Sequence, residues 1–304
     1  SSKHCYSYRM NITIIGAGEI GQALAGVLTQ NPDNTISLWD KADGKVSDQK
    51  PLEQIIPNAQ IIFMCVPSRA MRAAAKETSA HLPAETAIIS IAKGIEKDTL
   101  ATMDEVLTAE LPNNPIALLG GPLIAEEISQ GQTGVGLLAS ADKNALKNIP
   151  PIFSGTSIAI ATTNDIHGVA LAGVLKNVYA ISLGAATILS PGLNFRGWLV
   201  QQACAEMSVI IPQLGGQTAT AYTAAGLGDL IATGFSPDSS NHQTGRDLAE
   251  KGTTERQSEG YVSLRQVLDL IGDRQNRLPL LTAMKAIIID QKNAREVYDR
   301  LPVG

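Results

Sequence analysis

Short apolar runs alternate with helix-like segments through the first half of the chain. Most of the runs are unbroken rather than alternating with polar residues, which is typical of strands covered on both faces. They lie at 11–15, 35–39, 60–66, 87–92, 116–119, 134–139 and 157–161. Segments rich in Ala, Leu or Glu separate them and predict helices at 19–29, 68–80, 101–111, 124–129 and 144–149. This alternation predicts an α/β fold with a doubly wound, mostly parallel sheet.

The pattern changes after about Thr163. No convincing strand follows, and helical periodicity continues from Asp165 to the end of the chain, interrupted by turn residues. We therefore expect an α/β domain at 10–163 and an all-helical second domain at 164–304. Residues 1–9 are interpreted as an extension, native or left from expression, ahead of a natural start at Met10.

One segment of the helical half, 168–190, is apolar and long enough to cross a bilayer. Lys176 and Asn177 lie near its middle. A charge at the centre of a lipid-facing helix costs about 3 kcal/mol. The segment is therefore interpreted as a helix buried in protein, and no membrane span is expected.

Composition narrows the classes of partner. With 44% hydrophobic and 17% charged residues among 304, the chain is too apolar to be disordered. With a net charge of −5, the chain has no excess of basic residues to neutralise phosphates, and with 4% aromatic residues it has few side chains to stack on bases. Nucleic acid is therefore not an expected partner. The cysteines and histidines show no ligand spacing, so neither a metal site nor a disulfide framework is predicted, and the cytoplasm is the default compartment.

A glycine-rich turn follows the first apolar run. Gly16, Gly18 and Gly21 form the pattern G-x-G-x-x-G between a predicted strand and a predicted helix. Such glycines permit a tight turn, close approach of the backbone to a pyrophosphate, and close packing of the helix on the strand. Asp40 ends the next apolar run, where a carboxylate can accept both ribose hydroxyls of NAD and would repel the 2′-phosphate of NADP. A Rossmann-type dinucleotide-binding domain is predicted, with NAD favoured and NADP left open by the adjacent Lys41.

Lys176 is the most informative residue of the helical half, because its helix is apolar on nearly every side. An amine removed from water loses preference for its charged form, so its pKa falls and it becomes a usable proton acceptor. The alternative is a lysine that reaches the surface along its own methylene groups. The residues alone leave these two interpretations open.

Pro67, Lys93 and Gly121 stand at the carboxyl ends of other predicted strands. Ligands collect at this edge of open parallel sheets, so all three are candidates for a binding site. Glycine and proline are also ordinary turn residues, and a lysine in such a place can simply be solvated. These positions are suggestive only in combination.

The segment 221–230, Ala-Tyr-Thr-Ala-Ala-Gly-Leu-Gly-Asp-Leu, resembles the central signature of the NAD(P)-dependent glycerol-3-phosphate dehydrogenases. The similarity runs from Met10 through essentially the whole chain, and its motifs occur in the order found in that family. Besides the glycine turn, they are Val66-Pro-Ser68, Lys93-Gly94, Gly121-Pro-x-x-Ala125-Glu126-Glu127, Leu175-Lys176-Asn177, Gly192-x-Asn194-x-Arg196, Gly228-Asp229-Leu230, Ser239-x-Asn241 and Glu259-Gly260.

The resemblance implies an oxidoreductase that transfers a hydride between C2 of glycerol 3-phosphate, its small-molecule substrate, and C4 of the nicotinamide. It implies that Lys176 is the general acid/base at the C2 oxygen, that Lys93 touches both substrate and cofactor, and that Asp229 binds the glycerol part and orients Lys176. The other substrate-binding positions are Gly121, Asn177, Arg196, Ser239, Ser240 and Asn241. The cofactor-binding positions, with the glycine turn and Asp40 included, are Gly16, Gly18, Glu19, Ile20, Gly21, Asp40, Pro67, Lys93, Ala125 and Glu259.

The chain departs from the family at several of these positions. Ser240 stands where the family usually has an arginine that grips the substrate phosphate, and Leu123 replaces a serine that contacts the substrate. On the cofactor side, Glu19 and Ile20 stand where Ser-Trp is usual. A serine hydroxyl cannot replace the paired, charge-assisted bonds of a guanidinium, each of which contributes about 1.5–3 kcal/mol.

Three explanations of the missing arginine stay open. Arg196, Arg246 or His242 supplies the cation from a neighbouring position and glycerol 3-phosphate remains the substrate. Alternatively, the chain is a divergent dehydrogenase of another 2-hydroxy compound that lacks the phosphate. A third explanation is a non-catalytic NAD-binding sensor, although a lysine kept in an apolar helix argues for chemistry. A homodimer is left open as the state of assembly.

Overall fold

The computed structural model describes residues 9–190 and 192–302, so the predicted extension at 1–9 lies, apart from Arg9, outside the described residues. The chain forms two compact units. The first contains the described residues up to Ala92 together with Met103–Leu119 and Leu123–Ile166. The second contains Lys93–Thr102, Gly120–Pro122 and the described residues from His167 onward. Two short segments of the first half thus group with the second unit, and the limits 10–163 and 164–304 stay predictions.

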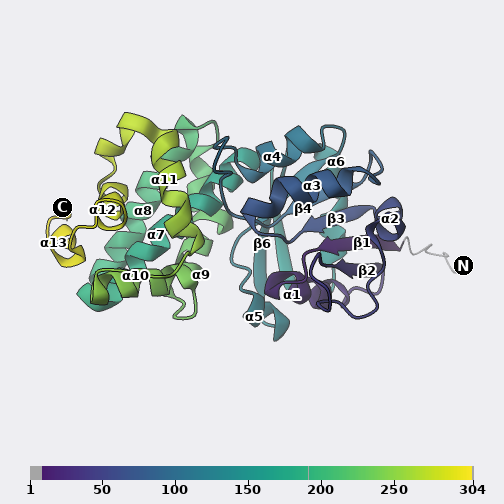
Figure 1. Cartoon of the computed structure of the whole chain (residues 1–304), viewed down its shortest axis with the longest axis horizontal. Coiled ribbons are helices and arrows are strands. Elements are labelled where there is room, and N and C mark those ends of the chain that lie inside the picture. The colour runs from purple at the N-terminus through teal and green to yellow at the C-terminus, as the bar shows by residue number, and fades with distance from the viewer. Residues whose placement is uncertain (1–8, 191, 303–304) are drawn as a thin grey trace, which may run out of the picture. The chain divides into compact units, whose positions relative to one another are not determined.

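The first unit is built on a seven-stranded sheet with the strand order β2-β1-β3-β4-β5-β6-β7 (Figure 1). The strands are β1 (Met10–Ile15), β2 (Asn34–Trp39), β3 (Ile61–Met64), β4 (Ala87–Ser90), β5 (Ile116–Gly120), β6 (Gly134–Ser140) and β7 (Ile158–Thr163). The pairs β1–β2, β1–β3, β3–β4, β4–β5 and β6–β7 are parallel. The register sets Ile15 opposite Trp39 and Met64, so β1, β2 and β3 end together at one edge of the sheet. The predicted doubly wound, mostly parallel sheet is confirmed.

Helices cover this sheet on both sides in Figure 1, where α1 packs against α5 and α3 against α4. The helices are α1 (Glu19–Leu28), α2 (Leu52–Ile55), α3 (Met71–Ser79), α4 (Met103–Glu110), α5 (Ala125–Ser129) and α6 (Lys143–Asn148). Every residue of β3, β4 and β5 is buried, which explains the unbroken apolar runs. The sequence did not predict α2, because a single helical turn is too short for a period to be recognised.

The second unit is helical, as expected, and no strand follows Thr163 in the described part of the chain. Its helices are α7 (Ile166–Leu189), α8 (Leu193–Gln213), α9 (Asp229–Phe235), α10 (Ser240–Lys251), α11 (Glu259–Ile271), α12 (Pro279–Ile288) and α13 (Ala294–Tyr298). A single π-helical turn, Ala224–Gly228, leads directly into α9. The family signature, residues 221–230, begins at the end of a 3₁₀ turn (Thr218–Tyr222) and continues through this π-helical turn into α9.

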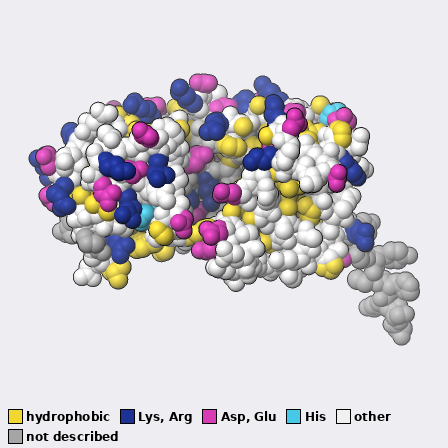
Figure 2. Space-filling view, turned by 60° about the horizontal axis from the view of Figure 1, so that its bottom comes forward, with side chains coloured by type: hydrophobic (Ala, Val, Ile, Leu, Met, Phe, Trp, Pro, Cys, Tyr) yellow, Lys and Arg dark blue, Asp and Glu magenta, His cyan; other side chains and the backbone are white. Residues whose placement is uncertain are grey.

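Helix α7 is long and apolar enough to cross a membrane by its length and composition. However, 94% of its most apolar 18-residue window is buried inside the protein, as in the core helix of a soluble protein. The interpretation of this segment as a helix buried in protein is confirmed. Over the face shown in Figure 2, basic and acidic side chains are interspersed.

Candidate active site

The glycine turn lies in the first unit, between β1 and α1. Gly16 has a φ of +104°, and a Cβ there would stand 2.5 Å from the carbonyl oxygen of Cys65. A Cβ on Gly21 would stand 1.9 Å from the carbonyl oxygen of Gly16. A Cβ on Gly18 would meet nothing within 4 Å, so the space beside this residue is open. Gly16 and Gly21 are therefore required by packing, whereas Gly18 borders open space.

The first turn of α1 faces this space without a side-chain cap. Gly18 is its N-cap residue and makes no capping hydrogen bond, so the first N–H groups of the helix, including those of Glu19 and Ile20, have no intrahelical partner. Free N–H groups and the positive end of the helix dipole suit an anion. The turn fits the pyrophosphate of a dinucleotide.

Asp40 follows β2 directly and turns its carboxylate toward the glycine turn. Its Oδ2 accepts a hydrogen bond of 2.7 Å from the backbone N–H of Ala17, and its Oδ1 accepts one of 2.8 Å from that of Ala42. The structure thus brings Asp40 to the turn, as the spacing predicted.

The remaining predicted cofactor contacts of the first unit lie on neighbouring elements. Pro67 follows β3 and precedes a 3₁₀ turn, Ser68–Ala70. Ala125 begins α5 and lines the same cavity as Glu19. Leu123, where the family has a serine, packs its side chain against the apolar core of this unit. It therefore contributes packing rather than a hydroxyl group.

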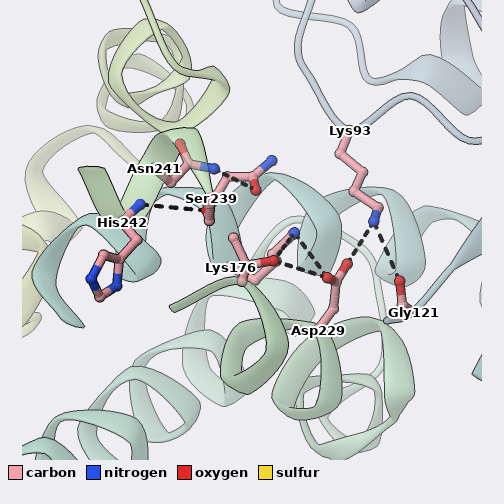
Figure 3. Close-up of polar contacts among 9 residues, drawn as sticks. Lys93, Gly121, Lys176, Asp229, Ser239, Asn241 and His242 are labelled. Carbon is pink, nitrogen blue, oxygen red and sulfur yellow. Dashed lines mark hydrogen bonds and ion pairs between the residues drawn. The ribbon is translucent and has the colours of Figure 1, made fainter. Parts of the chain in front are cut away.

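Lys176 lies in the second unit, in the middle of α7, with only 4% of its surface exposed. Its Nζ donates a hydrogen bond of 2.9 Å to Asp229 Oδ1 and one of 2.6 Å to Thr233 Oγ1 (Figure 3). Asp229 is the first residue of α9 and Thr233 lies one helical turn later, so both side chains point to α7. Of the two interpretations that the sequence left open, the structure supports the buried lysine.

Lys93 holds the second oxygen of the same carboxylate. Its Nζ donates a hydrogen bond of 2.6 Å to Asp229 Oδ2 and a longer one of 3.4 Å to the carbonyl oxygen of Gly121. Figure 3 shows both bonds. Lys93 and Gly121 lie in the two short segments of the first half of the chain that group with the second unit. One carboxylate therefore lies between two ammonium groups, and we call Lys93, Lys176, Asp229 and Thr233 the lysine cluster.

Burial and charge oppose each other in the lysine cluster. Burial lowers the pKa of Lys176 from 10.5 to about 8, although the neighbouring carboxylate of Asp229 acts to raise it, and the charge of Lys93 lowers it further. For Asp229, burial acts to raise the pKa, but the two ammonium groups outweigh burial and hold it below its usual value. The arrangement keeps an ionised carboxylate beside an amine that can exchange its proton near neutral pH.

A second polar group surrounds Asn177, the residue after Lys176. Asn241 Nδ2 donates a hydrogen bond of 2.9 Å to Asn177 Oδ1, and Asn241 Oδ1 accepts one of 2.9 Å from the N–H of Gly260. Both asparagines are buried. Glu259, a predicted cofactor contact, begins α11 next to Gly260 and is exposed.

Ser239 and Ser240 stand at the start of α10. Ser239 is the N-cap residue, and its hydroxyl accepts a hydrogen bond from the N–H of His242. Ser240, at the position of the family's arginine, is the first helical residue and is exposed. An arginine at this position would therefore have room for its side chain.

The three cations proposed to replace that arginine have different surroundings. Arg246 is exposed and pairs with Glu250 at 3.6 Å. His242 is buried, and its Nδ1 lies 2.6 Å from the carbonyl oxygen of Gly234. The guanidinium of Arg196 lies over the ring of Phe235, 5.3 Å from its centroid, and its Nε is buried with no hydrogen-bond partner among the described residues.

Thr233 is the residue of this site that the sequence reasoning missed. The signal was its spacing of four from Asp229 in a segment predicted to be helical, which places both side chains on one face. As for metals, no group of three or more His, Cys, Asp or Glu side chains could hold an ion anywhere in the described ranges.

Comparison with known proteins agrees with this geometry. Two family models match the chain: the N-terminus of NAD-dependent glycerol-3-phosphate dehydrogenase over residues 41–146, and the C-terminus of the same enzyme over residues 165–299. A glycerol-3-phosphate dehydrogenase (NAD(P)+) from Acinetobacter baylyi is 30% identical over 311 residues, which cover 92% of this chain and 86% of the relative. One from Acaryochloris marina is 36% identical over 240 residues, covering 79% and 76%.

A solved structure agrees as well. The crystal structure of glycerol-3-phosphate dehydrogenase from Coxiella burnetii matches with a TM-score of 0.85 at 25% identity, covering 98% of this chain and 100% of that one. The motifs, the two family models and the relatives therefore lead to one conclusion: the chain belongs to the family of NAD-dependent glycerol-3-phosphate dehydrogenases.

Proposed function

We propose that this protein is an NAD(P)-dependent dehydrogenase that interconverts glycerol 3-phosphate and dihydroxyacetone phosphate. The observation that carries the proposal is the buried Nζ of Lys176, bonded to Asp229 and Thr233, in a chain whose relatives are named as glycerol-3-phosphate dehydrogenases. A positioned group whose pKa is near the working pH is what proton exchange at a C2 oxygen requires.

Lys176 is assigned as the general acid/base. In oxidation its neutral amine accepts the proton of the C2 hydroxyl, and in reduction its ammonium returns that proton to the C2 oxygen. Asp229 stabilises the ammonium form, because its Oδ1 already lies 2.9 Å from Nζ. Thr233 holds the same nitrogen from a second direction and thus restricts where its remaining hydrogens point.

Lys93 is assigned to substrate and cofactor. An ammonium has three donors, and Asp229 and Gly121 use two of them, so the third is left for an oxygen of the substrate. We assign the glycine turn, Glu19, Ile20, Asp40, Pro67, Ala125 and Glu259 to the dinucleotide. The nicotinamide, when bound, supplies or accepts the hydride at C2.

Arg196 is the residue that we assign to the substrate phosphate, in place of the family's arginine at Ser240. Its Nε has no hydrogen-bond partner among the described residues, whereas Arg246 is paired with Glu250 and His242 with Gly234. A cation–π contact with Phe235, the last residue of α9, also holds the guanidinium beside the helix that contains Asp229. We assign Asn177, Ser239, Ser240 and Asn241 to the same end of the substrate.

The direct test offers the purified protein dihydroxyacetone phosphate with NADH, and then with NADPH, while nicotinamide absorbance is followed. We expect NADH to be oxidised. If the protein binds the nucleotide but oxidises neither cofactor, the proposal is wrong and a cofactor-binding sensor becomes the better account. Faster turnover of unphosphorylated dihydroxyacetone would instead identify a dehydrogenase of another hydroxy compound.

Arg196→Ala tests the phosphate assignment. Because each charge-assisted bond to phosphate contributes about 1.5–3 kcal/mol, we expect KM for dihydroxyacetone phosphate to rise about tenfold or more with little change in kcat. Arg246→Ala is the matched control, since its guanidinium pairs with Glu250 on the surface of α10. Equal effects of the two variants would contradict the assignment.

We further propose that the enzyme works in the cytoplasm. Cys65 and Cys204 are both free and buried, and burial raises the pKa of the Cys204 thiol to about 11, so neither behaves as a reactive or paired cysteine.

The homodimer stays a prediction. Light scattering coupled to size-exclusion chromatography would test it.

A further inference from the structure

Gly173 lies inside α7, three residues before Lys176, and is buried. Glycine is a poor residue for a helix interior, because it loses much conformational freedom on folding and has no side chain to pack. A Cβ built on Gly173 would stand 3.1 Å from Cγ of Lys93, 3.5 Å from its Cβ and 3.7 Å from its Cδ. The aliphatic stem of Lys93 therefore lies directly against the backbone of α7, where Gly173 leaves room for it.

Lys93 is held at both ends of its side chain. Its main chain begins the loop 93–102, which an antiparallel bridge between Ile95 and Thr102 closes. At the other end, its Nζ donates the hydrogen bond of 2.6 Å to Asp229 Oδ2. The stem between these two ends cannot bend away from α7 without moving the ammonium group.

The end of β5 packs on the same face of α7. A Cβ built on Gly120, the last residue of β5, would stand 3.0 Å from Cγ1 of Val169 and 2.9 Å from Cβ of Ala225. Val169, Gly173 and Lys176 follow one another at spacings of four and three, so they share one face of α7. This face therefore carries both of the short segments from the first half of the chain that group with the second unit.

We propose that Gly173 is a positioning residue for the lysine cluster: it lets Lys93 lie close against α7 and so holds its ammonium group on the carboxylate that also binds Lys176. Figure 3 shows Asp229 between the two lysines. A side chain at position 173 would lift the stem of Lys93 from the helix and displace its Nζ from Asp229. Gly173 thus acts through Lys93 and is assigned no contact with substrate or cofactor.

The position of Lys93 matters to Lys176 because charge couples the two. The charged groups that act on the pKa of Lys176 are Asp229 on α9, which raises it, and Lys93 in the loop 93–102, which lowers it. Displacement of Lys93 would weaken its repulsion of the Lys176 ammonium and leave Asp229 to attract that ammonium more strongly. Both changes favour the charged form of Lys176, so both act to raise its pKa.

NMR titration of the full-length protein, labelled at its lysine side chains and free of substrate, tests the proposal. In Gly173→Ala we expect the midpoint of Lys176 to rise by about half a pH unit or more, because the added methyl group displaces Lys93. We also expect kcat/KM for dihydroxyacetone phosphate to fall about tenfold, because small misplacements of reacting groups are costly. Loss of stability alone would leave the midpoint in place.

Gly26→Ala is the matched control. Gly26 also lies inside a helix, α1, but a Cβ there meets nothing within 4 Å. This variant should therefore keep the wild-type midpoint of Lys176 and the wild-type rate. Equal shifts of the midpoint in Gly173→Ala and Gly26→Ala would show that the shift does not depend on the contact with Lys93, and the proposal would be wrong.

Lys93→Met, which removes the charge and keeps an unbranched stem, completes a double-mutant cycle. Alone it should raise the midpoint of Lys176 more than Gly173→Ala does. Gly173→Ala should add no further shift in that background, because its effect passes through the ammonium of Lys93. An undiminished further shift would contradict the proposal. An unchanged midpoint in Lys93→Met would also overturn it, and this result does not require Gly173→Ala to fold.

The inference rests on the proposed function only for the role of the Lys176 proton, and the two can fail separately. A raised midpoint in Gly173→Ala, in a protein whose wild type does not oxidise NADH with dihydroxyacetone phosphate, would support the inference and contradict the proposed reaction. A wild-type midpoint in Gly173→Ala, with the circular dichroism spectrum of wild type, would overturn the inference.

Discussion

The two units each contain an aspartate whose two carboxylate oxygens are both hydrogen-bonded, but the partners differ. Backbone N–H groups of Ala17 and Ala42 hold Asp40 in the first unit. The ammonium groups of Lys93 and Lys176 hold Asp229 in the second. Asp40 is only half-buried, whereas Asp229 is 3% exposed. The carboxylate of Asp40 is thus a fixed acceptor beside open space, whereas that of Asp229 is the counter-ion of a buried amine.

Because of this difference, Asp40 is suited to recognising a ligand and Asp229 to controlling proton transfer. A carboxylate fixed by the backbone discriminates between ligands by the donors and charges that they bring. A carboxylate between two ammonium groups instead determines how readily one of them releases a proton, since it favours the charged form that burial disfavours. Changes in the first unit should therefore alter cofactor affinity, and changes in the lysine cluster should alter rates and their dependence on pH.

Lys176→Met should have the largest effect, and it should change turnover without changing cofactor binding. Loss of a positioned general acid/base typically costs 100- to 10,000-fold, and we expect kcat to fall by about 1000-fold. Affinity for NAD+ should be unchanged, and Asp229 keeps Lys93 and Thr233 as partners. Stopped-flow kinetics and calorimetry measure the two effects. Lys285→Met, at the surface of α12, is the control; a variant at Lys176 that retained full turnover would contradict the assignment.

Gly21→Ala should instead weaken cofactor binding in the first unit. A Cβ at this position would overlap the carbonyl oxygen of Gly16, so α1 must shift away from the glycine turn. We expect NAD+ to bind about 100-fold more weakly, because the first N–H groups of α1 would be displaced from the pyrophosphate. Gly26→Ala is the control in the same helix, since its Cβ meets nothing within 4 Å. Wild-type affinity in Gly21→Ala would show that the turn does not hold the cofactor.

The lysine cluster predicts a specific dependence on pH. Because burial lowers the pKa of Lys176 to about 8, its amine becomes neutral as the pH rises through that value. We therefore expect kcat/KM for oxidation of glycerol 3-phosphate to rise with pH and to level off above about 8, and the value for reduction to fall over the same range.

Asp229→Asn sharpens this pH prediction. Since the charge of Asp229 acts to raise the pKa of Lys176, its removal should move the midpoint of the oxidation profile to lower pH. Asp247→Asn removes a surface aspartate that also bonds a lysine, Lys251, and should leave the midpoint in place. A midpoint that moved upward in Asp229→Asn would contradict the electrostatic account.

Ser240→Arg should have the smallest effect, and in the opposite direction. Ser240 is exposed at the first position of α10, so an arginine there has room for its side chain, and the family resemblance implies that it would reach the phosphate. We expect KM for dihydroxyacetone phosphate to fall about tenfold. The effect should be larger in the background of Arg196→Ala than in wild type. If Ser240→Arg raised KM, the position would not face the phosphate.

Much of the first unit could be predicted from the sequence, because its information is local. The glycine turn and Asp40 lie within 25 residues, and the unbroken apolar runs correspond to strands β1 to β7. Two hydrogen bonds between the side chain of Gln49 and the main chain of Asp40 escaped prediction, because a side chain that bonds the main chain of a loop leaves no periodic pattern.

The lysine cluster was harder to predict, because its contacts join distant segments. Lys93 and Asp229 are 136 positions apart, and Lys176 and Asp229 are 53 apart. Periodicity indicated an apolar helix around Lys176 but left open whether its amine was buried. The family resemblance suggested the roles of three members, and only the fold brought Thr233 to them.

The central claim is that the buried amine of Lys176 exchanges its proton near neutral pH. NMR titration of the protein labelled at its lysine side chains tests this claim without any substrate. We predict one lysine resonance with a midpoint near pH 8, clearly below the ordinary lysine value of 10.5, and absent from the spectrum of Lys176→Met. A Lys176 resonance that titrated together with the surface lysines would contradict the account.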